Sequence, residues 1–330
     1  MKQVIRQPEL KMKTVSPAQE KSGSAANATS KQTSNVVLWL RFKEKAIHYF
    51  FFANGLIAVI ILVGIFSLLL TQGFPALKEV GLSEFFLSDH WDPTSPVRES
   101  YGILAMVVST LMVTIGALLI AVPVGIACAA YMADVANHRV REIIKPVIEI
   151  LAGIPSVVVG FLGIVVTGPF IAKVFGTSNG LNAVNGSILL AIMALPTIIS
   201  ISEDAIISVP QEFKNASLAL GANKWQTLSR VTIPSALSGI IAAVMLGMGR
   251  AIGETMTVLM ACGNAPALPH GFLDPVRTMT AAIAIELGET VQGGMHYRSL
   301  FVIGFVLFLM TFLVNLVSDL ILHKYQQVGR

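Results

Sequence analysis

The sequence predicts an all-α membrane protein with six transmembrane helices. Of its 330 residues, 54% are hydrophobic and only 13% are charged, and the mean hydropathy is +0.72. A soluble domain cannot bury that much apolar surface, so lipid must solvate a large part of the chain. Six apolar runs are long enough to cross a hydrocarbon core, which takes about 20 helical residues, and none alternates with the period of a lipid-facing strand. We place these spans at 47–71, 102–131, 147–167, 187–207, 234–261 and 299–322.

The segment before the first span, residues 1–46, is polar and basic. It is rich in Lys, Ser, Ala, Gln and Thr, a composition that predicts a disordered tail able to touch anionic lipid headgroups. The first apolar run starts too late and is too long for a signal peptide. The net charge of +4 comes from this tail and from loops between spans. No basic stripe interleaves with aromatic residues, so nucleic-acid binding is not predicted.

The distribution of basic residues predicts the orientation of the spans. Most of the 23 Lys and Arg residues lie in the tail, in the second and fourth connections, and after the last span at 323–330. Cytoplasmic segments carry an excess of Lys and Arg in membrane proteins. Both termini are therefore predicted to face the cytoplasm.

Two outer loops follow from this orientation. The loop at 72–101 is net acidic, and Phe85, Phe86 and Trp91 predict a short interfacial helix with aromatic anchors. Residues 275–290 are helical in composition but too short to cross, which predicts a surface or re-entrant helix at the outer mouth.

The inner loop at 208–234 predicts two short helices separated by a glycine. Ser208 and Gln211 have the spacing of a capping box. Gly221 is expected to end the first helix in a left-handed conformation. Asn223 and Gln226 are then placed to cap a second helix.

The first of these helices predicts a surface for a partner. Phe213, Ala216, Ser217 and Leu220 fall at helical spacing on one face, and Trp225 follows on the second helix. Small residues flanked by large apolar side chains suit the groove of a partner protein. The alternative is an amphipathic helix that lies on lipid headgroups.

Arg250 and Glu254 form a charged constellation inside the fifth span. An Arg in the bilayer costs about 3 kcal/mol on insertion scales, so it must face a polar cavity or a partner. Four residues apart, the two side chains are predicted to be neighbours on one helix face. The planar fork of Arg suits a tetrahedral oxyanion, and the carboxylate could accept the P–O–H proton that phosphate has and sulfate lacks. The alternative is an internal ion pair that packs helices.

The inner loop resembles the signature loop of ABC importer permeases, which reads E-A-A, three residues, G, nine residues, I-x-L-P. Asn215, Ala216 and Ser217 stand at the E-A-A positions and Gly221 at the glycine. The closing positions are Val231, Ile233 and Pro234. In that family the loop docks into a separate ATPase subunit. Because Asn215 replaces the usual Glu, no acidic contact to the ATPase is implied.

Other segments are similar to the PstC-type permeases of phosphate ABC importers. They are 149–160, Glu203-Asp204, 249–255 and 275–281, and the likeness covers residue 50 to the end. It implies the type I importer permease fold, with residues 102–322 as a core of five spans. It also implies a second permease, two ATPase subunits, a periplasmic phosphate-binding protein and inorganic phosphate as solute.

Several residues in these segments are candidates for a gating or structural role. Gly153 and Pro155 should interrupt the third span, a break tolerated where helices surround it. Glu203 and Asp204 stand at the inner end of the fourth span, where solvated carboxylates and a gating contact remain alternatives. Glu149 and Arg277 complete this set.

No catalytic, metal or cofactor site is predicted. The sequence has no Gly-x-x-x-x-Gly-Lys-Ser/Thr phosphate loop and no His-Glu-x-x-His pattern, so any ATP hydrolysis must come from another chain. The competing functions are a permease for sulfate or molybdate, a proton-coupled transporter that uses Glu254, and a membrane scaffold or sensor without a pore. The docking loop argues against the second, and the charges inside the span argue against the third.

Overall fold

The computed structural model describes residues 17–97 and 99–326, which are mostly helical. Within these ranges, five helical segments are long and apolar enough to cross a membrane. A sixth span results if two helices joined at a 69° bend are counted as one. The predicted all-α membrane fold with six spans is therefore confirmed, with one of the six bent. The plain spans are Lys43–Val80, Leu104–Val135, Ser156–Phe175, Ala183–Ile207 and Met295–Leu320.

The chain divides into two compact units, Met1–Ile65 and Phe66–Arg330. Helix α1 is assigned to Pro17–Val80, so it begins inside the segment predicted to be disordered. Ala, Gln, Lys and Glu are frequent there, and these residues favour helix. The rest of the predicted tail, residues 1–16, lies outside the described residues. In the first unit, every side chain from Lys43 to Ile65 is exposed, as expected for a helix solvated by lipid.

After the last part of α1, the second unit has a small folded loop that contains a short helix, as predicted, but two of the predicted aromatic anchors are buried in the protein. Helix α2 (Leu82–Leu87) is followed by strands β1 (Trp91–Asp92) and β2 (Ser100–Tyr101), which pair antiparallel with Trp91 opposite Tyr101. Phe85 and Trp91, which were predicted to anchor at the lipid interface, are buried in the protein. The predicted anchor role is wrong for Phe85 and Trp91, because they pack against α13 and α14 residues that are distant in the sequence; Phe86 is 37% exposed.

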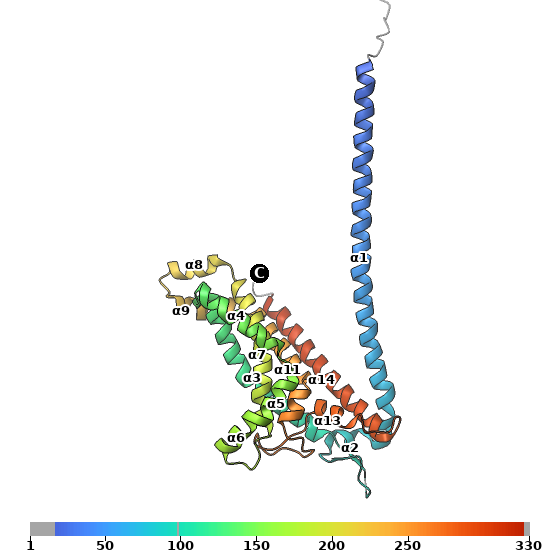
Figure 1. Ribbon diagram of the computed structural model, residues 1–330, viewed down its shortest axis with the longest axis vertical. Helices are drawn as coiled ribbons and strands as arrows, with labels where there is room; N and C mark the ends of the chain where they lie inside the picture. Colours follow the sequence, from blue (N-terminus) through green and yellow to red (C-terminus); the bar gives the residue numbers. More distant parts are fainter. Residues whose placement is uncertain (1–16, 98, 327–330) are drawn as a thin grey trace, which may run out of the picture. The chain divides into compact units, whose positions relative to one another are not determined.

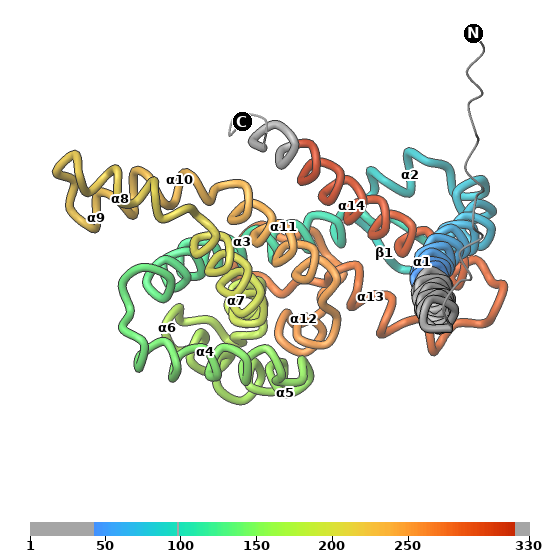
Figure 2. Tube along the Cα trace, turned by 90° about the horizontal axis from the view of Figure 1, so that it is seen from above, coloured from blue at the N-terminus to red at the C-terminus, as the bar shows by residue number. Residues whose placement is uncertain are grey.

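Helix α7 (Ala183–Ile207) is the centre of the second unit. It packs against α3 (Leu104–Ala130) and α11 (Leu237–Gly253), as Figure 2 shows. Glycines permit the close approach on both sides of Ile198. A Cβ atom added at Gly125 would lie 2.7 Å from Ile198 Cγ2, and one added at Gly247 would lie 2.7 Å from Ile198 Cγ1.

The third span starts later than predicted. A π-helical turn, η1 (Tyr131–Val135), ends the second span, and α4 (His138–Gly153) is a separate helix. The chain then breaks at Ile154 and Pro155, as predicted for Gly153 and Pro155, because a residue before proline favours extended backbone and Ile154 has φ −67° and ψ 126°. The span itself consists of α5 (Ser156–Leu162), η2 (Gly163–Thr167) and α6 (Gly168–Phe175).

The predicted continuous fifth span, 234–261, is replaced by a series of shorter pieces. The inner loop forms α8 (Gln211–Ala219), α9 (Lys224–Thr227), η3 (Leu228–Thr232) and α10 (Ile233–Ser235). After the bend comes α11, then a break, then α12 (Met256–Ala261).

Two helices complete the unit, α13 (Met279–Glu286) and α14 (Met295–Gln326). Helix α13 has 8 residues, which agrees with a helix too short to cross. Figure 1 shows α8 and α9 at one end of this unit, and α2, α6 and α13 at the other end. The two ends carry the loops that the sequence predicts to be inner and outer, and each candidate site below lies at one of them or in the span between.

Candidate functional site

The turn between α8 and α9 has the geometry that the sequence predicted. Gly221 has φ +88°, the left-handed region that glycine adopts without steric cost. Its N–H donates to the Leu218 carbonyl (3.0 Å), and the Ala222 N–H donates to the Ser217 carbonyl (3.2 Å). Helix α9 starts with a capping box between Asn223 and Gln226, also as predicted.

The predicted capping box at the start of α8 is wrong. Ser208 donates its hydroxyl to the Ala205 carbonyl at 2.7 Å, and the cap position of α8 is Pro210, without a side-chain hydrogen bond. Ser208 still has helical backbone, φ −67° and ψ −12°, whereas an N-cap side chain needs extended backbone. It therefore belongs to the end of α7.

Large apolar side chains project from the α8–α9 loop. Phe213 is 53% exposed, Trp225 is 71% exposed and Leu220 is 90% exposed. Exposed apolar groups clustered in this way are typical of a contact with another molecule. The remaining loop residues singled out in the sequence are Asn215, Ala216 and Pro234, all exposed, and Ser217, which is half-buried and hydrogen-bonded to Thr227.

Arg250 and Glu254 are not paired in the structure. The helix they were predicted to share ends at Gly253, and Glu254 has extended backbone with ψ 131°. The Arg250 guanidinium lies on the exposed surface of α11, where Nη1 is 3.5 Å from Thr197 Oγ1. The Glu254 carboxylate is instead 3.4 Å from both the N–H and the hydroxyl of Thr257. The prediction of neighbours on one helix face was wrong because the backbone breaks between them.

The break at Glu254 lies against the break that precedes α5. Thr257 Oγ1 donates to the Ser156 carbonyl at 3.2 Å, and Thr280 Oγ1 donates to the Glu254 carbonyl at 2.9 Å. Non-helical backbone at membrane depth is tolerated only when it is buried in protein or lines a water-filled cavity. The two breaks therefore mark one polar region within the unit.

Glu203 and Asp204 have different environments. Glu203 is 1% exposed, and its carboxylate pairs with Arg141 Nη2 at 2.6 Å and Lys145 Nζ at 3.8 Å, both on α4. Asp204 is exposed, and so is Glu149. Glu203 thus ties α4 to α7, so the alternative of a solvated carboxylate does not hold for this residue.

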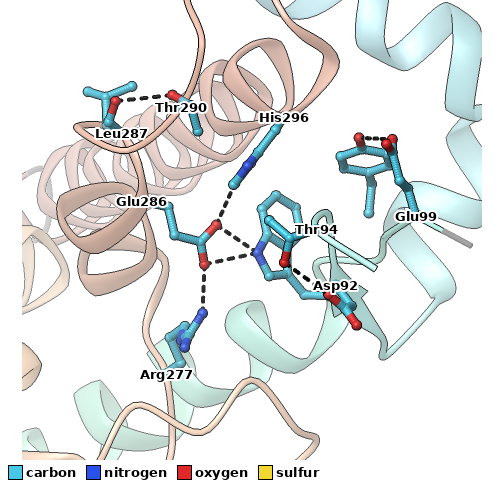
Figure 3. A network of polar contacts seen from close by, with 10 residues as sticks. Asp92, Thr94, Glu99, Arg277, Glu286, Leu287, Thr290 and His296 are labelled. Atoms are coloured by element: carbon cyan, nitrogen blue, oxygen red, sulfur yellow. Dashed lines mark hydrogen bonds and ion pairs between the residues drawn. The ribbon is translucent and has the colours of Figure 1, made fainter. Parts of the chain in front are cut away.

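Arg277 belongs to a polar network at the other end of the unit (Figure 3). The Glu286 carboxylate accepts from Arg277 Nη1 at 2.6 Å, from Trp91 Nε1 at 2.9 Å and contacts His296 Nε2 at 2.7 Å. The charged side chains are only 12–21% exposed. The network joins the β1–β2 loop to α13 and to the start of α14.

Tyr101 makes a further side-chain hydrogen bond in this loop. Its hydroxyl donates to Glu99 Oε2 at 2.5 Å. Burial and this hydrogen bond raise the pKa of the Tyr101 hydroxyl well above its ordinary value, so it remains a neutral donor at physiological pH.

Sequence reasoning missed Asn185, which is fully buried in α7. Its amide nitrogen donates to the carbonyls of Gly163 (3.0 Å) and Ala261 (3.2 Å). It therefore satisfies backbone groups of η2 and α12 at once. The available signal was the Asn182-x-x-Asn185 spacing, in which Asn182 caps α7 by accepting from the Asn185 N–H.

Comparisons with known proteins agree with this architecture. Residues 121–327 match the family described as binding-protein-dependent transport system inner membrane component. The chain is 40% identical over 263 residues to the probable ABC transporter permease protein YqgH of Bacillus subtilis. The aligned region covers 79% of this chain and 85% of that protein. It is 34% identical over 291 residues to the phosphate transport system permease protein PstC of Mesorhizobium japonicum, with coverage of 82% and 88%.

A solved structure shows the same fold. A chain of the MetNI methionine ABC transporter, in an inward-facing conformation, is 19% identical and superposes with a TM-score of 0.51. The match covers 68% of this chain and 94% of that chain.

Proposed function

Because the chain belongs to the family of binding-protein-dependent transport system inner membrane components, we propose that this ABC importer permease forms half of the translocation pathway for inorganic phosphate. It is a multi-pass protein of the bacterial inner membrane. Permeases named for phosphate transport are among its relatives at 30–36% identity, and this likeness supports the choice of solute.

The proposed partners follow from the two ends of the second unit. The α8–α9 loop, with Phe213, Leu220 and Trp225 exposed, would dock on the ATPase subunits at the cytoplasmic side. A second permease would complete the pathway, and a periplasmic phosphate-binding protein would deliver the solute at the opposite end. The chain has no nucleotide-binding motif, so the ATPase partner would supply hydrolysis.

The observation that carries the handling of an oxyanion is the free face of Arg250. A guanidinium has five N–H donors, and in the structure one nitrogen contacts Thr197 at 3.5 Å. Because the side chain is exposed on a helix that belongs to a span, its other donors are available to an anion in the pathway. The carboxylate of Glu254, which contacts Thr257 in the structure, would accept a hydrogen bond from the P–O–H group of phosphate.

The test is uptake of labelled phosphate by cells that lack other phosphate importers. Arg250→Gln should nearly abolish uptake, and Arg250→Lys should reduce it strongly, because lysine keeps the charge but lacks the paired donors. Arg139→Gln is the matched control, since Arg139 is an exposed arginine on α4, and it should have no effect. Membrane abundance is measured for each variant.

Two results would contradict the proposal. Uptake by Arg250→Gln equal to that of Arg139→Gln would show that Arg250 does not handle the solute. Inhibition of uptake by excess sulfate or molybdate as strong as by unlabelled phosphate would favour a permease for another oxyanion.

A further inference from the structure

Helix α8 contacts the end of the second span through a lysine side chain. Of its nine residues, Lys214 is the buried one, and its side chain is 11% exposed. Lysine is almost never buried unless it is paired. The partner is Asp134 of η1, with 2.5 Å between Nζ and Oδ1 and a carboxylate side chain that is 20% exposed.

Little else holds α8 against the second span. The helix has no apolar side that is buried, because Phe213 and Leu218 are 53% and 43% exposed. Its other polar attachment, between Ser217 and Thr227 at 3.0 Å, leads to the end of α9. A cavity of about 470 Å³ is lined by residues of α8 and by Asp134, Trp225 and Leu228.

Helix α8 is linked to α7 and α11 through the chain, but to α3 through a side-chain contact. Residues 208–210 join α8 directly to α7, and the chain from α9 through η3 and α10 leads to α11. Helix α3 is not next to the α8–α9 loop in the sequence. It reaches α8 through Asp134, which lies in the π-helical turn that continues α3.

A contribution to folding stability does not by itself explain this ion pair. Desolvation of two charges offsets much of their attraction, and apolar replacements of similar size are often neutral. The Asp134–Lys214 contact is part-buried, and such a pair fixes one relative position of two elements, since removal of either charge leaves the other without a partner.

We propose that the Asp134–Lys214 pair transmits movement of α8 to α3 during transport. This role rests on the proposed docking of the α8–α9 loop on an ATPase. When the ATPase moves α8, the pair would carry α3 with it, so that α3, α7 and α11 change position together. Asp134 and Lys214 are thus positioning residues, which act on the pathway through α3.

The experiment uses the complete importer, reconstituted in liposomes with its second permease, ATPase and phosphate-binding protein. Inorganic phosphate import and ATP hydrolysis are measured together, and the amount of co-purified ATPase is recorded. In Asp134→Asn and in Lys214→Met, the ATPase should co-purify in normal amount and hydrolyse ATP. Phosphate imported per ATP hydrolysed should fall by about tenfold or more, within the range of coupling between two sites.

Two further variants control for folding and for charge removal. The exchange of Asp134→Lys with Lys214→Asp restores an ion pair and should recover most of the import per ATP. Glu142→Gln makes the same carboxylate-to-amide change in the exposed His138–Glu142 pair, and it should leave the ratio unchanged.

The outcomes separate this proposal from the proposed function. Normal import per ATP in both single variants would overturn transmission through the pair, and so would loss of ATPase binding in them, because the pair would then only shape the docking surface. Failure of the exchanged pair to recover import beyond the single variants would also count against transmission. If the unaltered chain neither retains the ATPase nor imports phosphate, the proposed function itself is wrong.

Discussion

Replacement of Glu286 should release the β1–β2 loop from α13 and α14. Its carboxylate holds Arg277, Trp91 and His296 at 2.6, 2.9 and 2.7 Å. A hydrogen bond to a charged group contributes about 1.5–3 kcal/mol, and removal of one member of a buried ion pair costs about 3–5 kcal/mol. Since the charged members are 12–21% exposed, water compensates part of the loss.

For Glu286→Gln we expect the free energy of local opening to fall by about 2–4 kcal/mol, because an amide oxygen still serves one donor. That change corresponds to an increase of roughly 30- to 1,000-fold in the open population at 25 °C. The Gly102 amide is a suitable reporter, since it donates to the His90 carbonyl at 2.9 Å within this loop.

The assay is amide hydrogen exchange of the purified protein in detergent, read in peptides that cover residues 89–103. Glu289→Gln is the matched control, because Glu289 lies three residues further along and is exposed. Faster exchange in Glu286→Gln alone is the expected result. Equal exchange in the two variants would refute the reasoning that the carboxylate holds this loop.

Three further outcomes follow from the structure. Gly221→Val should weaken assembly with the ATPase while membrane insertion stays normal, because a β-branched residue at φ +88° costs about 1–3 kcal/mol; normal co-purification would contradict this. Asn185→Leu should lower thermal stability by about 1–3 kcal/mol, because it removes the side-chain donor to the Ala261 carbonyl, whereas the Gly163 carbonyl keeps the Gly168 N–H; an unchanged melting temperature would count against it. Reporter fusions at Asp89 and Glu212 should be active outside and inside the cytoplasm respectively, and the reverse pattern would disprove the predicted orientation.

Features that depend on neighbouring residues could be predicted from the sequence. The left-handed Gly221, the capping box at Asn223 and the break at Pro155 each follow from the chemistry of one residue and its neighbours. The long apolar runs likewise identify spans by length and composition. The error at Ser208 concerns a single helix boundary, where α7 extends further than the capping pattern indicated.

Features that depend on distant residues could not be predicted. Trp91 binds Glu286 from 195 positions away, so no local pattern could show that this aromatic residue is buried. Lys214 and Asp134 are 80 positions apart, and in sequence each looks like an ordinary charge in an inner loop. Periodicity places a residue on a face of its own helix, but it does not say which other helix lies opposite.

The separation of Arg250 from Glu254 has the same origin. A continuous helix would satisfy its own backbone groups and hold the two side chains together. Here Thr280 donates to the Glu254 carbonyl, so a hydroxyl group replaces a helical hydrogen bond that would be costly to lose in lipid. Thr257 joins the break to the start of α5 through the Ser156 carbonyl. The Thr280 hydroxyl makes the break tolerable, and the break turns the Glu254 carboxylate toward Thr257. Arg250 is thereby left without an acidic partner in the part of the chain that the structure describes, and for this reason we propose that its donors bind an anion.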